Sequence, residues 1–199
     1  MLDPNAVATV IADVFLDPNI PRPNKERPFL YLLRRDLQDI TGREDAPPDM
    51  NAHRAPMLAA NGFMIGFEML TKMRYGVQKH KIKFEDMERF LQDVGGLSFK
   101  DAEALAQFRH AVTHGYHLAA KKPSTGQDFT FELSDEPDES LSIFELQTQH
   151  FHVGFWPLKA LFLKSLRTYR AQLEADPHLQ GKFLCASRFM GTCHVTQSV

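Results

Sequence analysis

Apolar side chains recur at helical spacing along most of the 199-residue chain. Their separation by three and four residues predicts amphipathic helices over residues 4–15, 29–40, 56–74, 84–94, 99–120 and 149–175. Gly42 and the pair Gly95–Gly96 predict the ends of the second and fourth of these helices. Pro157 predicts either a kink in the last helix or its true first turn. The chain is therefore predicted to be mainly α-helical.

The period of the pattern changes from helical to two between residues 123 and 147. Phe129, Phe131 and Leu133 alternate with polar residues, and the alternation resumes at Leu141 and Ile143 after an acidic turn. Such alternation is typical of strands that bury one face. The predicted fold class is all-α, a helical bundle built on helices 56–74, 99–120 and 149–175, with one β-hairpin inserted at about 128–146.

Proline usage and weak patterning divide the chain further. Seven of the twelve prolines precede residue 49, and proline fixes φ and lacks an amide donor. Residues 1–50 are therefore predicted to be a proline-rich helical extension, residues 51–176 the helical domain, and residues 177–199 a C-terminal tail. Gly62 and Gly66 lie four apart on one predicted helix, where each costs about 1 kcal/mol relative to alanine. They predict the close approach of a neighbouring helix.

Composition narrows the functional classes. A net charge of −2 argues against a protein that coats nucleic acid through bulk charge, although a local basic groove remains open. The N-terminus has no secretory signal pattern, and no apolar run approaches 18 residues, so we expect a cytoplasmic protein without a membrane partner. In that compartment Cys185 and Cys193 are expected to be free thiols rather than a disulfide.

The most specific chemistry lies in residues 108–116, Phe-Arg-His-Ala-Val-Thr-His-Gly-Tyr. Arg109 carries a permanent cation with forked donors for a phosphate, and His114 suits proton transfer near neutral pH. Together with His110 as a second proton carrier, they provide the groups needed to cleave a phosphodiester without a metal. On an ideal helix Arg109 and His114 point about 140° apart. The helix therefore either bends near Gly115, or two copies of it assemble the site.

Arg109-x4-His114-x-Tyr116, with a polar residue after the arginine, resembles the signature of HEPN-domain proteins (higher eukaryotes and prokaryotes nucleotide-binding), in the form found in toxin-type members. The resemblance implies an all-α bundle that dimerises so that two motifs face each other, and a metal-independent endoribonuclease activity. Arg109 and His114 correspond to the catalytic pair, and His110 to the polar residue. Tyr116 corresponds to the tyrosine that a nucleotidyltransferase antitoxin modifies in toxin members.

Further residues are candidates by their position near this motif. His117 extends a histidine stripe that could hold zinc, but no carboxylate stands at ligand spacing, so no metal is predicted. Glu68 and Asn61, on the neighbouring predicted helix, either orient Arg109 or a histidine, or make only local hydrogen bonds. A basic segment is either a solvated face or an RNA-binding surface; it contains Lys72, Arg74, Lys79, Lys81 and Lys83, with Arg34, Arg35, Lys121 and Lys122 as further candidates.

Two hypotheses follow from these residues. The first is a metal-independent endoribonuclease that needs no cofactor, acts as a toxin or defence protein, forms a homodimer and binds RNA. The alternative is a non-catalytic module of the same fold that binds a nucleotide, an RNA or a protein. The intact Arg109/His114 pair favours the first, while fold alone does not fix function. The sequence contains no P-loop, dinucleotide glycine motif or Gly-x-Ser-x-Gly, so it does not support chemistry of those classes.

Overall fold

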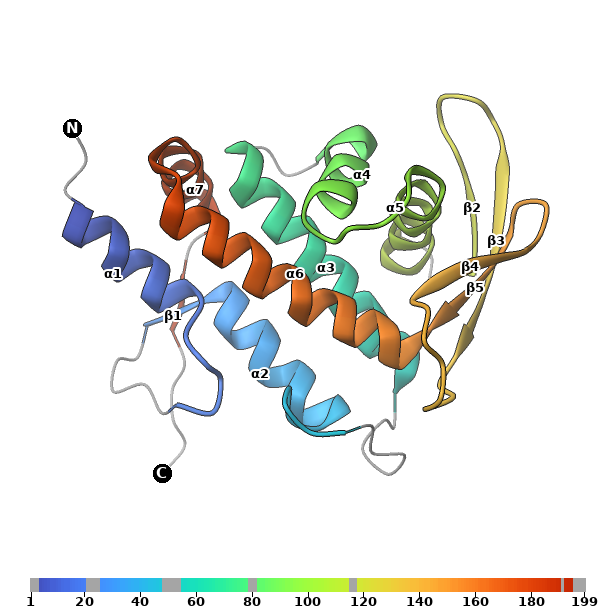
Figure 1. The fold of residues 1–199 in the computed structure, drawn as a ribbon, viewed down its shortest axis with the longest axis horizontal. Coiled ribbons are helices and arrows are strands. Elements are labelled where there is room, and N and C mark those ends of the chain that lie inside the picture. Colours follow the sequence, from blue (N-terminus) through green and yellow to red (C-terminus); the bar gives the residue numbers. More distant parts are fainter. Residues whose placement is uncertain are drawn as a thin grey trace.

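The computed structural model describes residues 4–20, 26–47, 55–78, 82–114, 118–190 and 192–194. Within these ranges the chain is mainly helical, as its hydrophobic spacing predicted (Figure 1). The helices are α1 (Pro4–Val14), α2 (Phe29–Thr41), α3 (Pro56–Tyr75), α4 (Phe84–Asp93), α5 (Phe99–His114), α6 (Phe155–Ala175) and α7 (Pro177–Met190). The strands are β1 (Glu26–Pro28), β2 (Ala119–Lys121), β3 (Asp128–Ser134), β4 (Ile143–Gln147), β5 (His150–Gly154) and β6 (Thr192–His194).

Helix α3 lies at the centre of the bundle and contacts α2, α4, α5, α6 and α7. Its two interior glycines explain how the neighbours come so close. A Cβ atom on Gly62 would lie 2.7 Å from the Leu37 side chain of α2, and one on Gly66 would lie 2.5 Å from the Phe162 ring of α6. The predicted close approach is confirmed, but the neighbours belong to the same chain. This glycine pair therefore does not provide the surface for a homodimer.

Helix α5 begins as predicted and ends earlier than predicted. The Asp101 amide donates to Ser98 Oγ at 3.2 Å, so Ser98 is the N-cap of the helix, and Ser98 Oγ donates to the Asp101 carboxylate at 2.6 Å. The predicted helix to residue 120 is wrong, because α5 ends at His114 and residues 119–121 form β2. Gln107, a polar residue of this helix, is fully buried. Helix α5 is covered by α3, α4 and the sheet, so its buried surface is wider than a single apolar face.

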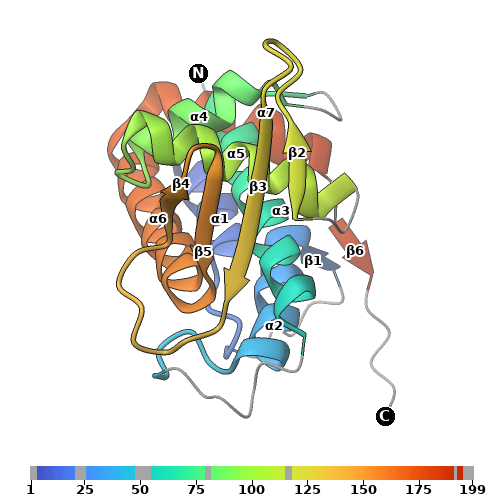
Figure 2. The same ribbon diagram turned by 90° about the vertical axis from the view of Figure 1, so that its right-hand side faces the viewer.

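The predicted single hairpin at 128–146 is wrong. Strands β2 to β5 form one four-stranded sheet in the order β2-β3-β5-β4, in which β3 pairs parallel with β5 and does not pair with β4 (Figure 2). Two separate hairpins, β2–β3 and β4–β5, therefore lie side by side. Phe151 and Phe155 are four residues apart, which fits a helix, but Phe151 also alternates with His150 and His152, which fits a strand. In the structure, residues 150–154 form the strand β5. Helix α6 begins after β5, with Pro157 in its true first turn.

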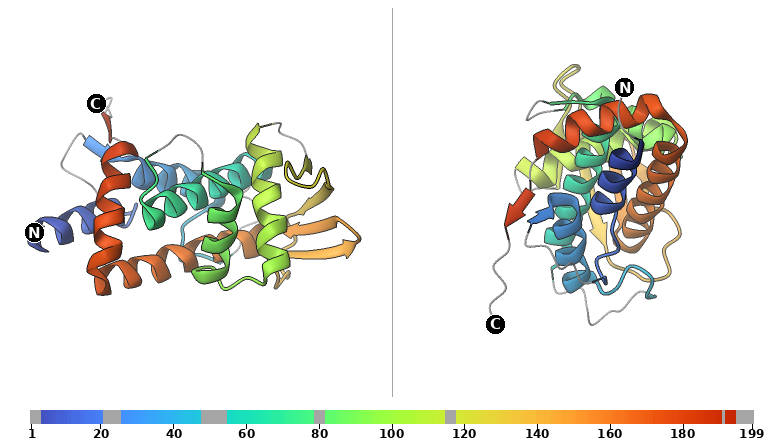
Figure 3. Two further views of the ribbon diagram at one scale, coloured as in Figure 1. Left: turned by 90° about the horizontal axis from the view of Figure 1, so that it is seen from above. Right: turned by 90° about the vertical axis from the view of Figure 1, so that its left-hand side faces the viewer.

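The sheet packs through its aromatic face onto α5. Phe129, Phe131 and Phe151 are buried, and the Phe131 ring meets Phe108 of α5 with its centroid 5.3 Å away. Helix α5 thus stands between the sheet and the other helices (Figure 3). Because aromatic rings bury large apolar areas, this contact fixes the position of the helix that carries the arginine–histidine motif.

The C-terminal segment is more ordered than its weak pattern predicted. Residues 177–190 form α7, which buries Phe183 and Leu184 and contacts α3 and α6. A local signal was present, since the Asp176 carboxylate accepts a hydrogen bond from the His178 amide at 2.8 Å and Pro177 opens the helix. Strand β6 pairs antiparallel with β1. Helices α1 and α7 contribute side chains to the same hydrophobic core as α3 and α6.

The outer face of the sheet carries a histidine between two carboxylates. His152 of β5 contacts Glu132 of β3 through Nδ1 at 2.7 Å and Glu139 of the β3–β4 connection through Nε2 at 2.5 Å. Burial alone would lower the pKa of His152, but the hydrogen bonds and charges of Glu132 and Glu139 outweigh it and raise this pKa above its ordinary value. The hydrogen bond from His152 in turn lowers the pKa of Glu132.

The glycine contacts of α3 predict different costs for two identical substitutions. Gly66→Ala drives a methyl group into the buried Phe162 ring, and overpacking of this kind costs about 1–3 kcal/mol. Gly62→Ala meets only the end of the flexible Leu37 side chain, so the helix-propensity gain of about 1 kcal/mol offsets the contact. Urea denaturation of the two variants should show Gly66→Ala as clearly the less stable. Equal stabilities would contradict this account of the α3–α6 contact.

The His152 cluster predicts a pH-dependent contribution to stability. A raised histidine pKa contributes stability below the unfolded value of 6.5 that is lost as pH rises through the folded pKa. A lowered carboxyl pKa contributes stability above 4.5 that is lost as pH falls. The difference in unfolding free energy between the wild type and His152→Gln should therefore be largest near pH 4.5–6.5 and shrink by pH 9. His178→Gln, at an exposed position, is the control and should give a flat difference.

Candidate functional site

Two polar contacts connect the motif helix α5 to the central helix α3. Arg109 Nη2 donates to Glu68 Oε2, and the two side chains are each 12% exposed. Toward the end of α5, Thr113 Oγ1 donates to Asn61 Oδ1 at 3.1 Å. Glu68 therefore contacts the arginine of the motif directly. Asn61 contacts the residue that precedes His114.

Glu68 is shared between two cations. Lys72, one turn further along α3, places its Nζ 2.8 Å from Glu68 Oε1, while Arg109 binds Oε2. Burial pushes the pKa of Glu68 upward, but the hydrogen bonds and charges of Lys72 and Arg109 outweigh it and lower this pKa below its ordinary value. Glu68 is thus ionised at neutral pH. Arg109, Lys72 and Glu68, here called the α3–α5 charge cluster, thus place two cations on one carboxylate.

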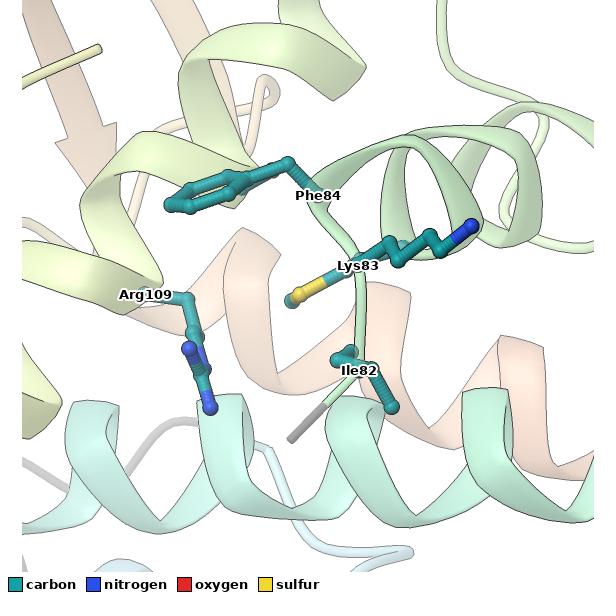
Figure 4. A pocket seen from close by; sticks show the side chains of 6 residues that line it. Ile82, Lys83, Phe84 and Arg109 are labelled. Carbon is teal, nitrogen blue, oxygen red and sulfur yellow. The ribbon is translucent and has the colours of Figure 1, made fainter. Parts of the chain in front are cut away.

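The space around Arg109 on the α4 side is narrow. A hollow of about 10 Å³ is lined there by Ile82, Lys83, Phe84, Met87, Ala106 and Arg109. Figure 4 shows Arg109 reaching from α5 toward α3, while the Lys83 ammonium is directed away from it. The His110 ring packs edge-on against Phe84, with the ring centroids 5.6 Å apart. This hollow has room for about one water molecule, so a larger ligand would have to reach Arg109 from another side.

Several predicted site residues fall outside the part of the chain that the structure describes. His114 is the last residue of α5, and its side chain is not among the described groups. Tyr116 and His117 also lie outside the described residues, as do Lys79 and Lys81.

The predicted basic residues that the structure describes have partners on several different elements. Lys72 belongs to the α3–α5 charge cluster, whereas Arg74 donates to Gln172 of α6 at 2.5 Å and lies 3.9 Å from Asp93 of α4. Arg34 is a structural residue, because its guanidinium donates twice to Glu44 at 2.8 Å each. Ion pairs also engage Arg35 with Asp36, Lys121 with Asp128 and Lys122 with Glu103.

A larger depression that sequence reasoning missed lies on the other side of the cluster. It measures about 260 Å³ and is lined by Phe29 of α2, by Ile65, Glu68, Met69 and Lys72 of α3, and by Met190 of α7. No linear motif contains these residues, because they come from three separate helices. The only signal available in the sequence was the spacing of 65, 68, 69 and 72, which places four α3 residues on one helical face.

The described residues contain neither a metal-binding group nor a helix that could cross a membrane. Within the described ranges, no group of three or more His, Cys, Asp or Glu side chains is arranged to hold a metal ion. Of the helices that the structure describes, none combines the length and the apolar character needed to cross a membrane. Comparisons of the chain with protein-family models, with curated proteins and with solved structures found no significant match.

The α3–α5 charge cluster predicts a large effect for one isosteric substitution. Glu68→Gln leaves Arg109 and Lys72 close together and nearly buried without their counter-charge. Removing one member of a buried ion pair costs about 3 kcal/mol or more. Glu174→Gln is the matched control, because its pair with Arg170 is about half exposed and such pairs contribute less than about 1 kcal/mol. Urea denaturation should separate the two variants clearly, and similar stabilities would show that the cluster is not effectively buried.

Proposed function

We propose that this chain is a metal-independent endoribonuclease of HEPN type. The observation that supports it is the α3–α5 charge cluster, in which the Glu68 carboxylate contacts both the motif arginine and Lys72. A phosphodiester is the ligand that such a pair of cations would favour, because arginine offers forked donors and lysine a point charge. The intact Arg109-x4-His114 spacing adds the proton-transfer group.

The proposed reaction uses the RNA's own 2′-hydroxyl. The 2′-oxygen attacks the adjacent phosphorus while a base removes its proton, and the bond from phosphorus to the 5′-oxygen breaks as an acid protonates that oxygen. The products are a 2′,3′-cyclic phosphate and a free 5′-hydroxyl. His114 serves as acid or base, His110 is the second proton carrier, and Arg109 stabilises the negative charge that develops on the phosphate.

The proposed enzyme is a homodimer, and the geometry of the motif helix supports this. Gly62 and Gly66 pack against α2 and α6 of the same chain, so they do not support a homodimer. The angular separation of Arg109 and His114 on one helix supports the homodimer, because two copies of the motif across a two-fold axis would bring both residue types to one phosphate. A toxin or defence role, with Tyr116 as the target of a nucleotidyltransferase antitoxin, follows from the resemblance alone.

A second function is favoured by a different observation. Arg109 is already paired with Glu68, and the hollow beside it on the α4 side holds about 10 Å³. Both features suit an arginine that supports the fold of a non-catalytic module binding a nucleotide, an RNA or a protein. The two functions differ in whether His114 and the forked donors of Arg109 are needed for cleavage.

A cleavage assay in excess EDTA distinguishes the two functions. Purified protein is incubated with mixed single-stranded RNA, and the fragment ends are identified by mass spectrometry. We expect 2′,3′-cyclic phosphate or 3′-phosphate ends, and a loss of about 10²- to 10⁴-fold in rate for His114→Ala. Arg109→Lys keeps a cation next to Glu68 but loses the forked donors, so its rate should fall strongly while the fold persists.

The control variant for this assay lies outside the motif. Arg43→Ala removes a positive charge that is 64% exposed beyond the end of α2, at a residue outside the candidate RNA-binding set, and should leave the rate unchanged. Activity that disappears in EDTA would indicate a metal-dependent site. Unchanged cleavage in His114→Ala would refute the catalytic assignment, and an absence of cleavage in a folded protein that still binds RNA would favour the non-catalytic module.

A further inference from the structure

The connection between β3 and β4, residues 135–142, is attached at both of its ends and is here called the strap. Strand β4 lies on the far side of β5 from β3 (Figure 2), so the strap passes over the end of β5, where α6 begins. The Trp156 indole donates to the Asp135 carbonyl oxygen at 3.0 Å, and the Gly154 amide donates to the Ser142 carbonyl oxygen at 3.2 Å. The strap thus covers the junction of strand and helix.

One side chain joins the middle of the strap to the sheet. Among residues 136–141 only Glu139 is not exposed, and its Oε1 lies 2.5 Å from His152 Nε2. Its other oxygen, Oε2, is buried and has no hydrogen-bond partner among the described residues. A Cβ atom on Gly154 would clash with this oxygen and lie 2.8 Å from the Leu141 carbonyl oxygen. The strap therefore packs directly on the backbone of the glycine.

The geometry of His152 requires a charged ring. Its Nδ1 lies 2.7 Å from Glu132 and its Nε2 lies 2.5 Å from Glu139. Ionised carboxylates only accept hydrogen bonds, so both ring nitrogens must donate, and both carry a proton only in the imidazolium. The His152 side chain is 12% exposed and stacks on the Phe144 ring with the centroids 4.7 Å apart. Little water can therefore replace the two carboxylate contacts.

From this geometry we propose that the strap is a pH-sensitive latch over the start of α6, closed while His152 is charged and open when it is neutral. A neutral ring keeps one N–H between two carboxylates, so one carboxylate faces a lone pair and neither receives a charge from the ring. Glu132 is 50% exposed and can turn into water without moving its strand. Glu139 is 17% exposed and has an oxygen without a partner, and a buried carboxylate that loses its cation is costly. Glu139 therefore regains solvation only when the strap lifts.

The groups around the ring give the direction of the pH effect. Glu132 faces it from β3 and Glu139 from the strap, which also carries Asp135, Glu136 and Asp138. Strand β4 contributes the uncharged Phe144, and His150 of β5 lies 3.8 Å from Glu132. Burial acts to lower the pKa of His152, but the two carboxylates outweigh it and raise this pKa above its ordinary value of 6.5. The strap is therefore closed at pH 6.5 and opens as pH rises through the raised pKa, independently of any RNA cleavage.

Trp156 fluorescence measures the state of the strap, because Trp156 is the single tryptophan of the chain, is 6% exposed and donates to the strap. Emission of the full-length protein is recorded between about pH 6 and about pH 9, and circular dichroism checks that the fold persists. We expect the emission maximum to move to longer wavelength with a one-proton midpoint above pH 6.5. His152→Gln should give the long-wavelength emission at every pH. His150→Gln, on the same strand, is the matched control and should retain the transition.

A second variant opens the strap without changing a titratable group. The Gly154 backbone, at φ −78° and ψ 121°, accepts alanine. The added methyl group would still lie against the Leu141 carbonyl oxygen and the Glu139 carboxylate. Gly154→Ala should therefore show the long-wavelength emission at about pH 6, where His152 is charged. Gly181→Ala, where an added Cβ atom meets nothing within 4 Å, is its control and should keep the wild-type emission.

Proteolysis identifies the segment that moves. A glutamyl endopeptidase must bind the Glu139 side chain, so early cleavage after Glu139, measured against a peptide substrate in the same sample, should rise with the midpoint of the emission shift. If the emission shifts while this cleavage stays constant, Glu132 alone turns away and the latch is wrong. An emission maximum that does not change with pH would also refute it, as would a transition that persists in His152→Gln. Wild-type emission from Gly154→Ala at about pH 6 would contradict the packing of the strap on this glycine and the latch with it.

Discussion

The burial of α3 on nearly all sides is the constraint on which the rest of the structure depends. Five helices contact it, and two glycines allow α2 and α6 to approach its backbone. Polar groups on such a helix must find partners, because an unpaired buried charge or amide costs several kcal/mol. Thr71 donates to the Phe67 carbonyl at 2.8 Å, and Asn61 and Glu68 find their partners on α5. The position of the motif helix thus follows from the need to satisfy α3.

Because Glu68 pairs with Arg109 of α5, it has two opposing effects on the proposed chemistry. Its contact with Arg109 orients the guanidinium, and it also cancels part of the positive charge that a phosphate would need. Lys72 restores that charge from the same helix. In the proposed reaction, both cations that share this carboxylate are available to the phosphate. A single arginine–glutamate pair would be neutral and would attract no phosphate.

The sheet holds α5 by a different kind of interaction. Its inner face packs phenylalanines against α5, and its outer face keeps polar groups together through His152, Glu132 and Glu139. Lysines have a similar structural role elsewhere, as Lys159 of α6 donates to the carbonyls of Thr41, Gly42 and Arg43 at the end of α2. Several basic residues that the structure describes therefore serve the fold, and a count of lysines and arginines does not distinguish them from residues that bind a ligand.

The sequence by itself determined most helix positions, the close approach at Gly62 and Gly66, and the motif around Arg109, because each is encoded by spacing within a few residues. Tertiary structure decided the rest. The parallel pairing of β3 with β5 and the burial of Gln107 depend on which distant elements pack together. So does the depression at Phe29, whose lining comes from three helices far apart in sequence. Local periodicity contains no information about such long-range contacts, since the same pattern fits several arrangements of neighbours.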